Sequence, residues 1–424
     1  MSTSHDAAVS TGAGTDRLVV VGAGIAGVSA AGAARTAGFD GEIVLVGDEP
    51  ELPYRRPPVS KEVVRGEKAA DDIRIRKAEW YEQQRIDLRT GVRVDALDVD
   101  GHAVVLDSGE RLAYGSLVLA TGGRARTLDG LTAPDAPGVR TLRDLADVDG
   151  VVAGLAPGAH VVVVGAGLIG SEIAASARDL GAEVTLLEAA DLPLRHLLPP
   201  SLGELYVRLH ADRGTDLQTG VEVTAIDAGP DGSTVVTAAD GRTWSAPLVV
   251  VAVGMVPNAE LAAQAGLPVE GGAVVVDEHG RTSAPDVFAA GDVALLPSGV
   301  LGRHHRVEHW QGAQNHGAAV GKNVAGQDVV FDEVPWCWSD QYGHTLQVTG
   351  WPAAEHELVV RGSLDDLDFT AFLLDDGVVR GAVTIGRPGE VRVARQWIAA
   401  GARPSTAALQ DAADLASAVV EVPA

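Results

Sequence analysis

Two short glycine-rich stretches carry the residue types and spacing needed to bind a phosphorylated nucleotide. Each has four apolar residues, then glycines in the order G-x-G-x-x-G, then an apolar segment with helical spacing. The glycines are Gly22, Gly24 and Gly27 in the first copy and Gly165, Gly167 and Gly170 in the second. In a strand–turn–helix, these glycines permit a tight turn, close approach of a diphosphate and packing of the helix on the strand. Two copies in one chain therefore predict two dinucleotide sites, with Ala26, Leu168 and Ile169 among the contacting residues.

An acidic residue follows the second predicted strand of each copy, where a carboxylate binds the ribose hydroxyls of a dinucleotide. In the first copy Asp48 follows the strand Glu42 to Val46, and Glu49 is the alternative. In the second copy Glu188 ends the strand that begins at Ala182. A 2′-phosphate at 4 Å from this carboxylate would be repelled by about 4 kcal/mol per pair of unit charges. We therefore expect the second site to take NADH rather than NADPH.

The composition restricts the function classes. The chain has 424 residues, 46% hydrophobic and 21% charged, which is typical of a globular enzyme of two or three domains. A formal net charge of −25 disfavours nucleic acid and anionic membrane surfaces as partners. No apolar run reaches the roughly 18 residues of a membrane span. The first 16 residues lack the pattern of a signal peptide, and we expect a cytoplasmic protein.

The stretch from Tyr54 to Lys61 reads Y-R-R-P-P-V-S-K, with Ser60 placed to cap a following helix. It resembles the Y-x-R-P-P-L-S-K signature of oxygenase-coupled NADH–ferredoxin reductases. These are two-dinucleotide-domain flavoproteins related to rubredoxin and putidaredoxin reductases and to apoptosis-inducing factor. Residues Thr282 to Asp292 match the same family's T-S-x-P-x-(I/V)-(F/Y)-A-x-G-D pattern. The resemblance covers nearly the whole chain after Asp16.

The resemblance implies an α/β fold with two Rossmann-like domains and a small α/β C-terminal domain. It predicts a flexible tail over 1–16, an FAD-binding domain over 17–126 and 255–330, an NAD-binding domain over 127–254, and a C-terminal domain over 331–424. FAD and NADH are the implied cofactors. The chain would act as a monomer or a homodimer.

The same resemblance assigns roles to individual residues. Lys61 would lie beside the flavin ring and pair with Glu172, which we expect in the first turn of the second motif's helix; these two are the candidate catalytic residues. Asp292 would accept hydrogen bonds from the ribityl chain, and the helix that opens near Trp310 would point at the flavin. The remaining implied cofactor contacts are Arg56, Val94, Ala120, Thr121, Arg126, Gly254, Gly291, Glu308 and His309.

The cysteine count separates related activities. Disulfide reductases and NADH oxidases of this fold use one or two cysteines beside the flavin, whereas the only cysteine here, Cys337, lies outside both motifs. The sequence therefore predicts hydride transfer from NADH to FAD, followed by single-electron transfer to a small iron–sulfur ferredoxin that serves an oxygenase. A rubredoxin or monodehydroascorbate reductase, or a redox-modulated binding protein like apoptosis-inducing factor, is the alternative. Trp336 and Trp338 fit core or interface positions better than an electron-transfer role.

A ferredoxin is usually acidic, as this chain is, so docking needs a local positive surface. Basic residues adjoin the flavin motifs in sequence, and we expect them to line that surface. They are Arg55, Arg56, Arg303, His304, His305 and Arg306.

Overall fold

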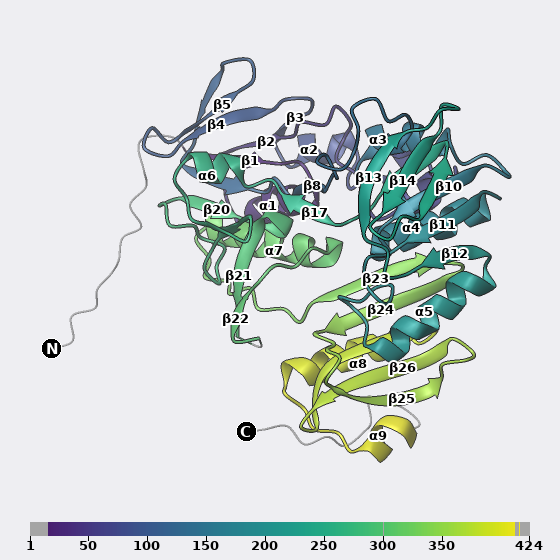
Figure 1. The fold of residues 1–424 in the computed structure, drawn as a ribbon. Helices are drawn as coiled ribbons and strands as arrows, with labels where there is room; N and C mark the ends of the chain where they lie inside the picture. Colours follow the sequence, from purple (N-terminus) through teal and green to yellow (C-terminus); the bar gives the residue numbers. More distant parts are fainter. Residues whose placement is uncertain (1–15, 300, 412–414, 416–424) are drawn as a thin grey trace. The chain divides into compact units, whose positions relative to one another are not determined.

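The computed structural model describes residues 16–299, 301–411 and 415, so the predicted N-terminal tail lies outside the described residues except for Asp16. The chain divides into two compact units, coloured along the sequence in Figure 1. Unit 1 comprises residues 1–55, 74–123 and 257–332, and unit 2 comprises residues 56–73, 124–256 and 333–424. The short strands β8 (Gly123–Ala125) and β17 (Met255–Pro257) lie where the chain passes from one unit to the other.

Unit 1 is built on a parallel sheet of apolar strands, as expected for strands covered on both faces. Its order is β20 (Val287–Ala289), β7 (Ser116–Leu119), β1 (Arg17–Val21), β2 (Glu42–Val46) and β3 (Ile86–Arg89). Two smaller sheets accompany it. The first consists of β4 (Val94–Asp98), β5 (Ala103–Leu106) and β6 (Arg111–Ala113). The second consists of β18 (Val269–Glu270), β19 (Ala273–Val275), β21 (Ala294–Ser298) and β22 (Arg303–His305). The helices are α1 (Ile25–Thr36), α2 (Ala78–Gln83), α6 (Glu260–Gln264), η3 (Gly291–Val293) and α7 (Trp310–Val324).

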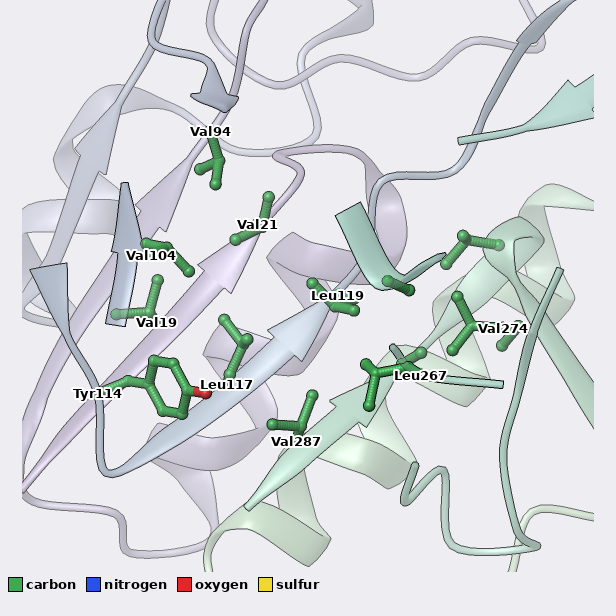
Figure 2. Close-up of a cluster of buried hydrophobic side chains, with 14 of the residues drawn as sticks. Val19, Val21, Val94, Val104, Tyr114, Leu117, Leu119, Leu267, Val274 and Val287 are labelled. Atoms are coloured by element: carbon green, nitrogen blue, oxygen red, sulfur yellow. The ribbon is translucent and has the colours of Figure 1, made fainter. Parts of the chain in front are cut away.

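One core cluster joins the three sheets of unit 1. Figure 2 shows Val19, Leu117 and Val287 of the parallel strands gathered with Val104 of the first small sheet and Val274 of the second. Each of these side chains is at most 1% exposed. The cluster fixes the carboxyl ends of β1 and β7, from which the nucleotide-binding turns leave.

Helices α1 and α7 pack closely because small residues face one another. A Cβ on Gly317 would lie 2.2 Å from the carbonyl oxygen of Ala26, and a Cβ on Gly321 would lie 2.1 Å from that of Ala30. Glycine is therefore required at both positions, and the N-terminus of α7 is held beside the first glycine-rich turn.

Unit 2 repeats the parallel architecture. Its sheet has the order β12 (Thr215–Gln218), β11 (Glu183–Leu187), β10 (His160–Val164), β16 (Leu248–Val251) and β9 (Val139–Arg140), with an antiparallel sheet of β13 (Val223–Ala228), β14 (Thr234–Ala238) and β15 (Thr243–Ala246). Its helices here are η1 (Val59–Val63), η2 (Ala70–Ile73), α3 (Leu145–Val152), α4 (Leu168–Asp179) and α5 (Pro200–Asp212).

The C-terminal part of unit 2 is an antiparallel sheet with helices. The strand order is β23 (Trp336–Gln341), β24 (His344–Gly350), β27 (Val378–Ile385), β26 (Asp368–Asp375) and β25 (Glu357–Ser363), followed by α8 (Pro388–Ala399) and α9 (Thr406–Asp411). The turn between β26 and β27 is a tight hairpin turn, since Asp376 and Gly377 both have positive φ. Among the described residues, no helix has both the length and the apolar character to cross a membrane.

Candidate functional site

The first glycine-rich turn has the geometry of a phosphate cradle. Gly22 has φ +107°, and a Cβ there would lie 2.2 Å from the carbonyl oxygen of Ala120. A Cβ on Gly27 would lie 1.9 Å from the carbonyl oxygen of Gly22, so this glycine lets α1 pack on the turn. Gly24 differs, because a Cβ there would meet no atom within 4 Å. The open side of the turn therefore faces free space at the N-terminus of α1, where backbone N–H groups bind phosphate.

The second turn repeats this arrangement in unit 2. Gly165 has φ +101°, and a Cβ on Gly170 would again lie 1.9 Å from a carbonyl oxygen, that of Gly165. A Cβ on Gly167 would meet nothing within 4 Å. Next to it, Leu168 begins α4 and Ile169 is 38% exposed, an unusual exposure for a large apolar side chain. The residues present thus fit a second dinucleotide.

The acidic residues of the two copies are held differently. Glu188 accepts hydrogen bonds from the backbone N–H of Ala166 within the turn, at 2.6 Å, and from that of Ala190, at 2.8 Å. Its carboxylate is therefore fixed against the glycine-rich turn. In unit 1 Asp48 is exposed, and Glu49 accepts a hydrogen bond from the Tyr54 hydroxyl. The choice of Asp48 over Glu49 stays a prediction.

Asp292 lies in the short helix η3, which packs against the first cradle. A Cβ on Gly291 would lie 2.7 Å from the Cβ of Ala26, and the backbone N–H of Gly291 donates to Nδ1 of the buried His316 at 3.1 Å. Burial lowers the pKa of His316 to about 3, so the ring stays neutral and able to accept this bond. His316 is a supporting residue that the sequence analysis missed.

The helix expected near the flavin, α7, begins at Trp310 with His309 as its N-cap residue. Burial lowers the pKa of His309, although the carboxylates of Asp292 and Glu308 oppose the shift. Its side chain makes no capping bond to the first turn of α7.

Other predicted contacts lie at the ends of strands. In unit 1 Val94 begins β4 and is 8% exposed, while Ala120 follows β7. The Thr121 hydroxyl donates to the carbonyl of Asn258 at 2.7 Å, and the Asn258 side chain donates back at 3.0 Å. This reciprocal pair of bonds fixes the turn at Ala120, Thr121 and Gly122, which follows β7.

In unit 2 Arg126 is exposed, and its backbone N–H donates to the carbonyl of Gly254 at 2.9 Å. Its guanidinium donates to the carbonyl of Met255 at 3.2 Å. Arg56 donates to the carbonyl of Arg143 at 3.1 Å. The cofactor roles of these arginines stay predictions.

Lys61 and Glu172 form a buried ion pair. The Lys61 Nζ lies 3.0 Å from the Glu172 Oε1, and the two side chains are 5% and 6% exposed. A buried pair persists only where further hydrogen bonds compensate the loss of water. The Ser60 hydroxyl provides one of them to Glu172 Oε2, at 2.5 Å. The structure therefore makes the pair that the resemblance implied.

Two local predictions are wrong. Ser60 does not cap a helix, because Pro58 precedes the π-helical turn η1 and the Ser60 hydroxyl binds Glu172 instead. Glu172 is not in the first turn of its helix, since α4 begins at Leu168 and Glu172 is its fifth residue. The helix dipole is thus a weaker support for this carboxylate than its direct donors.

Sequence reasoning also missed Ser339, whose hydroxyl donates to Glu172 Oε1 at 2.8 Å. It lies on β23, where Cys337, Ser339 and Gln341 are buried in alternation with Trp336 and Trp338. That polar alternation was readable from the sequence, but its partner 167 residues away was not. The two tryptophans stack with ring centroids 5.2 Å apart.

Cys337 lies on the same face of β23 as Ser339. Burial and the nearby Glu172 carboxylate raise the pKa of its thiol to about 12. A protonated, buried thiol is a poor nucleophile, which agrees with the expectation that it carries no redox chemistry.

Comparison with known proteins agrees with this geometry. Residues 16–317 match the family model described as pyridine nucleotide-disulphide oxidoreductase, and residues 336–419 match the model described as reductase C-terminal. The chain belongs to the pyridine nucleotide-disulphide oxidoreductase family. Its fold is accordingly an α/β fold of the Rossmann type with a separate C-terminal segment, as predicted.

Individual members of the family align over almost their full length. The ferredoxin–NAD(+) reductase component of the anthranilate 1,2-dioxygenase system of Burkholderia cepacia is 42% identical, covering 93% of this chain and 97% of that protein. Putidaredoxin reductase of Pseudomonas putida is 36% identical, covering 90% and 92%. The solved covalent complex of putidaredoxin reductase with putidaredoxin superposes with a TM-score of 0.89 at 35% identity, over 93% of this chain and 96% of that one.

Proposed function

We propose that this protein is an NADH-dependent, FAD-containing reductase that delivers electrons to a small iron–sulfur ferredoxin of an oxygenase system. The observation that carries the proposal is the pair of open glycine cradles. In the second cradle, Glu188 is bound to the turn. The one cysteine of the chain, Cys337, is buried and protonated. The relatives named above support it, since they are reductase components that work with ferredoxins.

The residues of unit 1 fit FAD, with the diphosphate on the turn around Gly24, the ribityl chain on Asp292 and the ring at the N-terminus of α7. Those of unit 2 fit NADH, with the diphosphate on the turn around Gly167 and the ribose on Glu188. Bound FAD would accept a hydride from NADH and pass the electrons on singly.

Lys61 and Glu172 serve as the charged pair of the hydride-transfer site. The Glu172 carboxylate holds the Lys61 ammonium in one orientation within a buried environment, where a fixed charge acts more strongly than in water. We propose this role on the geometry of the pair together with the place of Glu172 on α4, which starts at the second cradle. We further propose a cytoplasmic location, since NADH is regenerated there.

The test is an anaerobic titration of the FAD-loaded protein with NADH, followed in the visible spectrum, and then with an iron–sulfur ferredoxin. We expect one equivalent of NADH to bleach the flavin absorbance, and NADPH to do so far more slowly. Oxidised ferredoxin should restore the absorbance. A rubredoxin and monodehydroascorbate run in parallel test the alternative acceptors. Protein that is colourless and takes up no FAD would overturn the proposal.

Four residues of the proposed docking surface, Arg303, His304, His305 and Arg306, lie on or next to β22 in unit 1. Arg303 and His304 on β22 are exposed, whereas Arg306 is 23% exposed and pairs with Glu308. Burial lowers the pKa of His305, so this ring adds no charge at neutral pH. We therefore propose that Arg303 carries more of the attraction than Arg306.

A docking test compares two electron acceptors. Neutralising both arginines with glutamine should slow ferredoxin reduction by about tenfold at low salt and leave NADH–ferricyanide reduction unchanged. Arg303→Gln alone should account for most of the loss. Equal loss with both acceptors would reject the assignment.

A further inference from the structure

The buried Glu172 carboxylate receives more donors than its ion pair alone supplies. Lys61 Nζ and Ser339 Oγ both bind Oε1, at 3.0 and 2.8 Å, and Ser60 Oγ binds Oε2 at 2.5 Å. Glu172 itself is 5% exposed. Hydrogen bonds to a buried charge are worth more than those between neutral groups, so each donor limits how the carboxylate can turn.

The direction of each bond in this network follows from chemistry. A carboxylate only accepts, so the Ser339 hydroxyl must give its proton to Glu172. The Ser339 oxygen is then left to accept, and it does so from Gln341 Nε2 at 3.0 Å. Gln341 thus orients Ser339, and Ser339 orients Glu172. Since Ser339 is 0% and Gln341 1% exposed, water is excluded from taking over either bond.

The fold explains why both residues reach the same point. Side chains alternate across a strand, so Ser339 and Gln341 share one face of β23. That face packs against α4, which carries Glu172. On the other side of the carboxylate, η1 is attached to α4 by the Ser176 hydroxyl, which donates to the carbonyl of Ser60 at 2.9 Å.

We propose that Ser339, oriented by Gln341, is a positioning residue for the Lys61–Glu172 pair. The segment matched as reductase C-terminal thereby supplies one of the groups that hold the Lys61–Glu172 pair in place. The effect on hydride transfer rests on the proposed function, whereas the effect on the pair itself does not.

The first measurement is the limiting rate of flavin reduction by NADH in single-turnover experiments on FAD-loaded protein. Ser339→Ala should lower this rate about tenfold, and the milder Gln341→Met about threefold, since it leaves the hydroxyl in place. The apparent dissociation constant for NADH should change by less than about twofold, because neither residue belongs to the cradle. The double variant should be no slower than Ser339→Ala, since Gln341 acts through Ser339.

The second measurement needs no turnover. The lysines of this sequence are Lys61, Lys68, Lys77 and Lys322, and of these Lys61 alone is buried. Acetylation of the FAD-loaded protein by an N-hydroxysuccinimide ester, read by peptide mass spectrometry, reports how firmly the Lys61 ammonium is held. Ser339→Ala should raise the Lys61 rate about tenfold relative to the other three lysines.

The matched control is Thr384→Val, which removes another fully buried hydroxyl from the same sheet. Thr384 donates to the carbonyl of Phe369 at 2.7 Å. We expect this variant to keep the wild-type reduction rate and Lys61 protection. Unchanged Lys61 acetylation in Ser339→Ala, or equal changes in Ser339→Ala and Thr384→Val, would overturn the proposal. If acetylation changes as expected but NADH reduces no variant and no wild-type protein, the proposed function fails and the positioning role stands.

Discussion

The two glycine-rich units of this chain have nearly the same backbone and different surroundings. Gly22 and Gly165 have φ of +107° and +101°, and in both units the third glycine approaches the carbonyl oxygen of the first so closely that a Cβ would lie 1.9 Å from it. Gly24 and Gly167 alike face open space. The turn by itself therefore specifies a diphosphate and says nothing about which nucleotide carries it.

The differences begin beside the turn. Directly after the second strand, unit 1 has Gly47, whose Cβ would lie 2.6 Å from the Cβ of Ala23, whereas unit 2 has Glu188 bound to the turn. Seven residues after the first glycine, unit 1 has Ser29 and unit 2 has Glu172. Helix α1 packs on the glycines of α7, while α4 carries Glu172, the acidic member of the charged pair. We therefore expect the choice of nucleotide and the chemistry to depend on the residues around a common cradle.

The largest expected effect comes from filling the open glycine of each cradle. Gly24 and Gly167 have φ of −72° and −77°, which a side chain tolerates, and a Cβ meets no protein atom. Gly24→Val should leave the protein folded but lower its affinity for FAD by more than about a hundredfold. Gly167→Val should retain FAD but bind NADH at least about a hundredfold more weakly.

These two variants are each other's controls. Flavin content after gel filtration and the NADH concentration needed to bleach the flavin separate the two losses, and far-UV circular dichroism checks the fold. Loss of FAD from Gly167→Val, or normal NADH binding by it, would break the assignment of one nucleotide to each unit.

A smaller expected effect is the loss of stability at acid pH, which comes from one buried histidine in each unit. His316 in unit 1 and His210 in unit 2 are buried, and burial lowers their pKa values from 6.5 to about 3 and about 4. The unfolded chain therefore binds a proton below pH 6.5 that the folded chain does not. Above pH 6.5, neither histidine changes the free energy of unfolding. Below pH 6.5, each lowers the free energy of unfolding by up to about 1.4 kcal/mol per pH unit, until the pKa of the folded state is reached.

Urea unfolding at pH 7.0, 5.5 and 4.5 checks this dependence, with flavin release as the signal for unit 1. His316→Asn should flatten the acid loss of flavin, because asparagine can accept the Gly291 bond without titrating. The exposed His304, changed to asparagine, serves as control and should keep the wild-type dependence. An unchanged acid response of His316→Asn would contradict the prediction.

The sequence predicted the parts of the fold that depend on local pattern. The strand Glu42–Val46 was predicted residue for residue, because an apolar run and a following glycine mark such an end. Other strand limits depend on distant partners, as where β4 begins at Val94, which pairs with Leu106.

The candidate site was predictable where a motif encodes backbone geometry and unpredictable where distant segments meet. The glycines and Glu188 were readable from spacing alone. Ser60 was misread as a cap because serine suits that role locally, and only tertiary contact with Glu172 reveals its bond. Ser339 and His316 were missed for the same reason, since their partners Glu172 and Gly291 lie far away in sequence.

The smallest expected effect concerns the acidic residues that tell the two units apart. Glu188→Gln keeps the shape of the side chain but removes its charge and one acceptor, so NADH affinity should fall about tenfold and the preference over NADPH should shrink by about as much. In unit 1, Asp48→Asn should weaken FAD by only about threefold, because Asp48 is exposed and solvent screens its charge. Glu49→Gln should have a smaller effect still, since Tyr54 already occupies one oxygen of that carboxylate. Fluorescence titration of each variant with its nucleotide measures these differences. A larger FAD loss in Glu49→Gln than in Asp48→Asn would transfer the ribose to Glu49. The acidic residue of unit 1 would then be the third residue after its strand, whereas Glu188 is the first residue after its own.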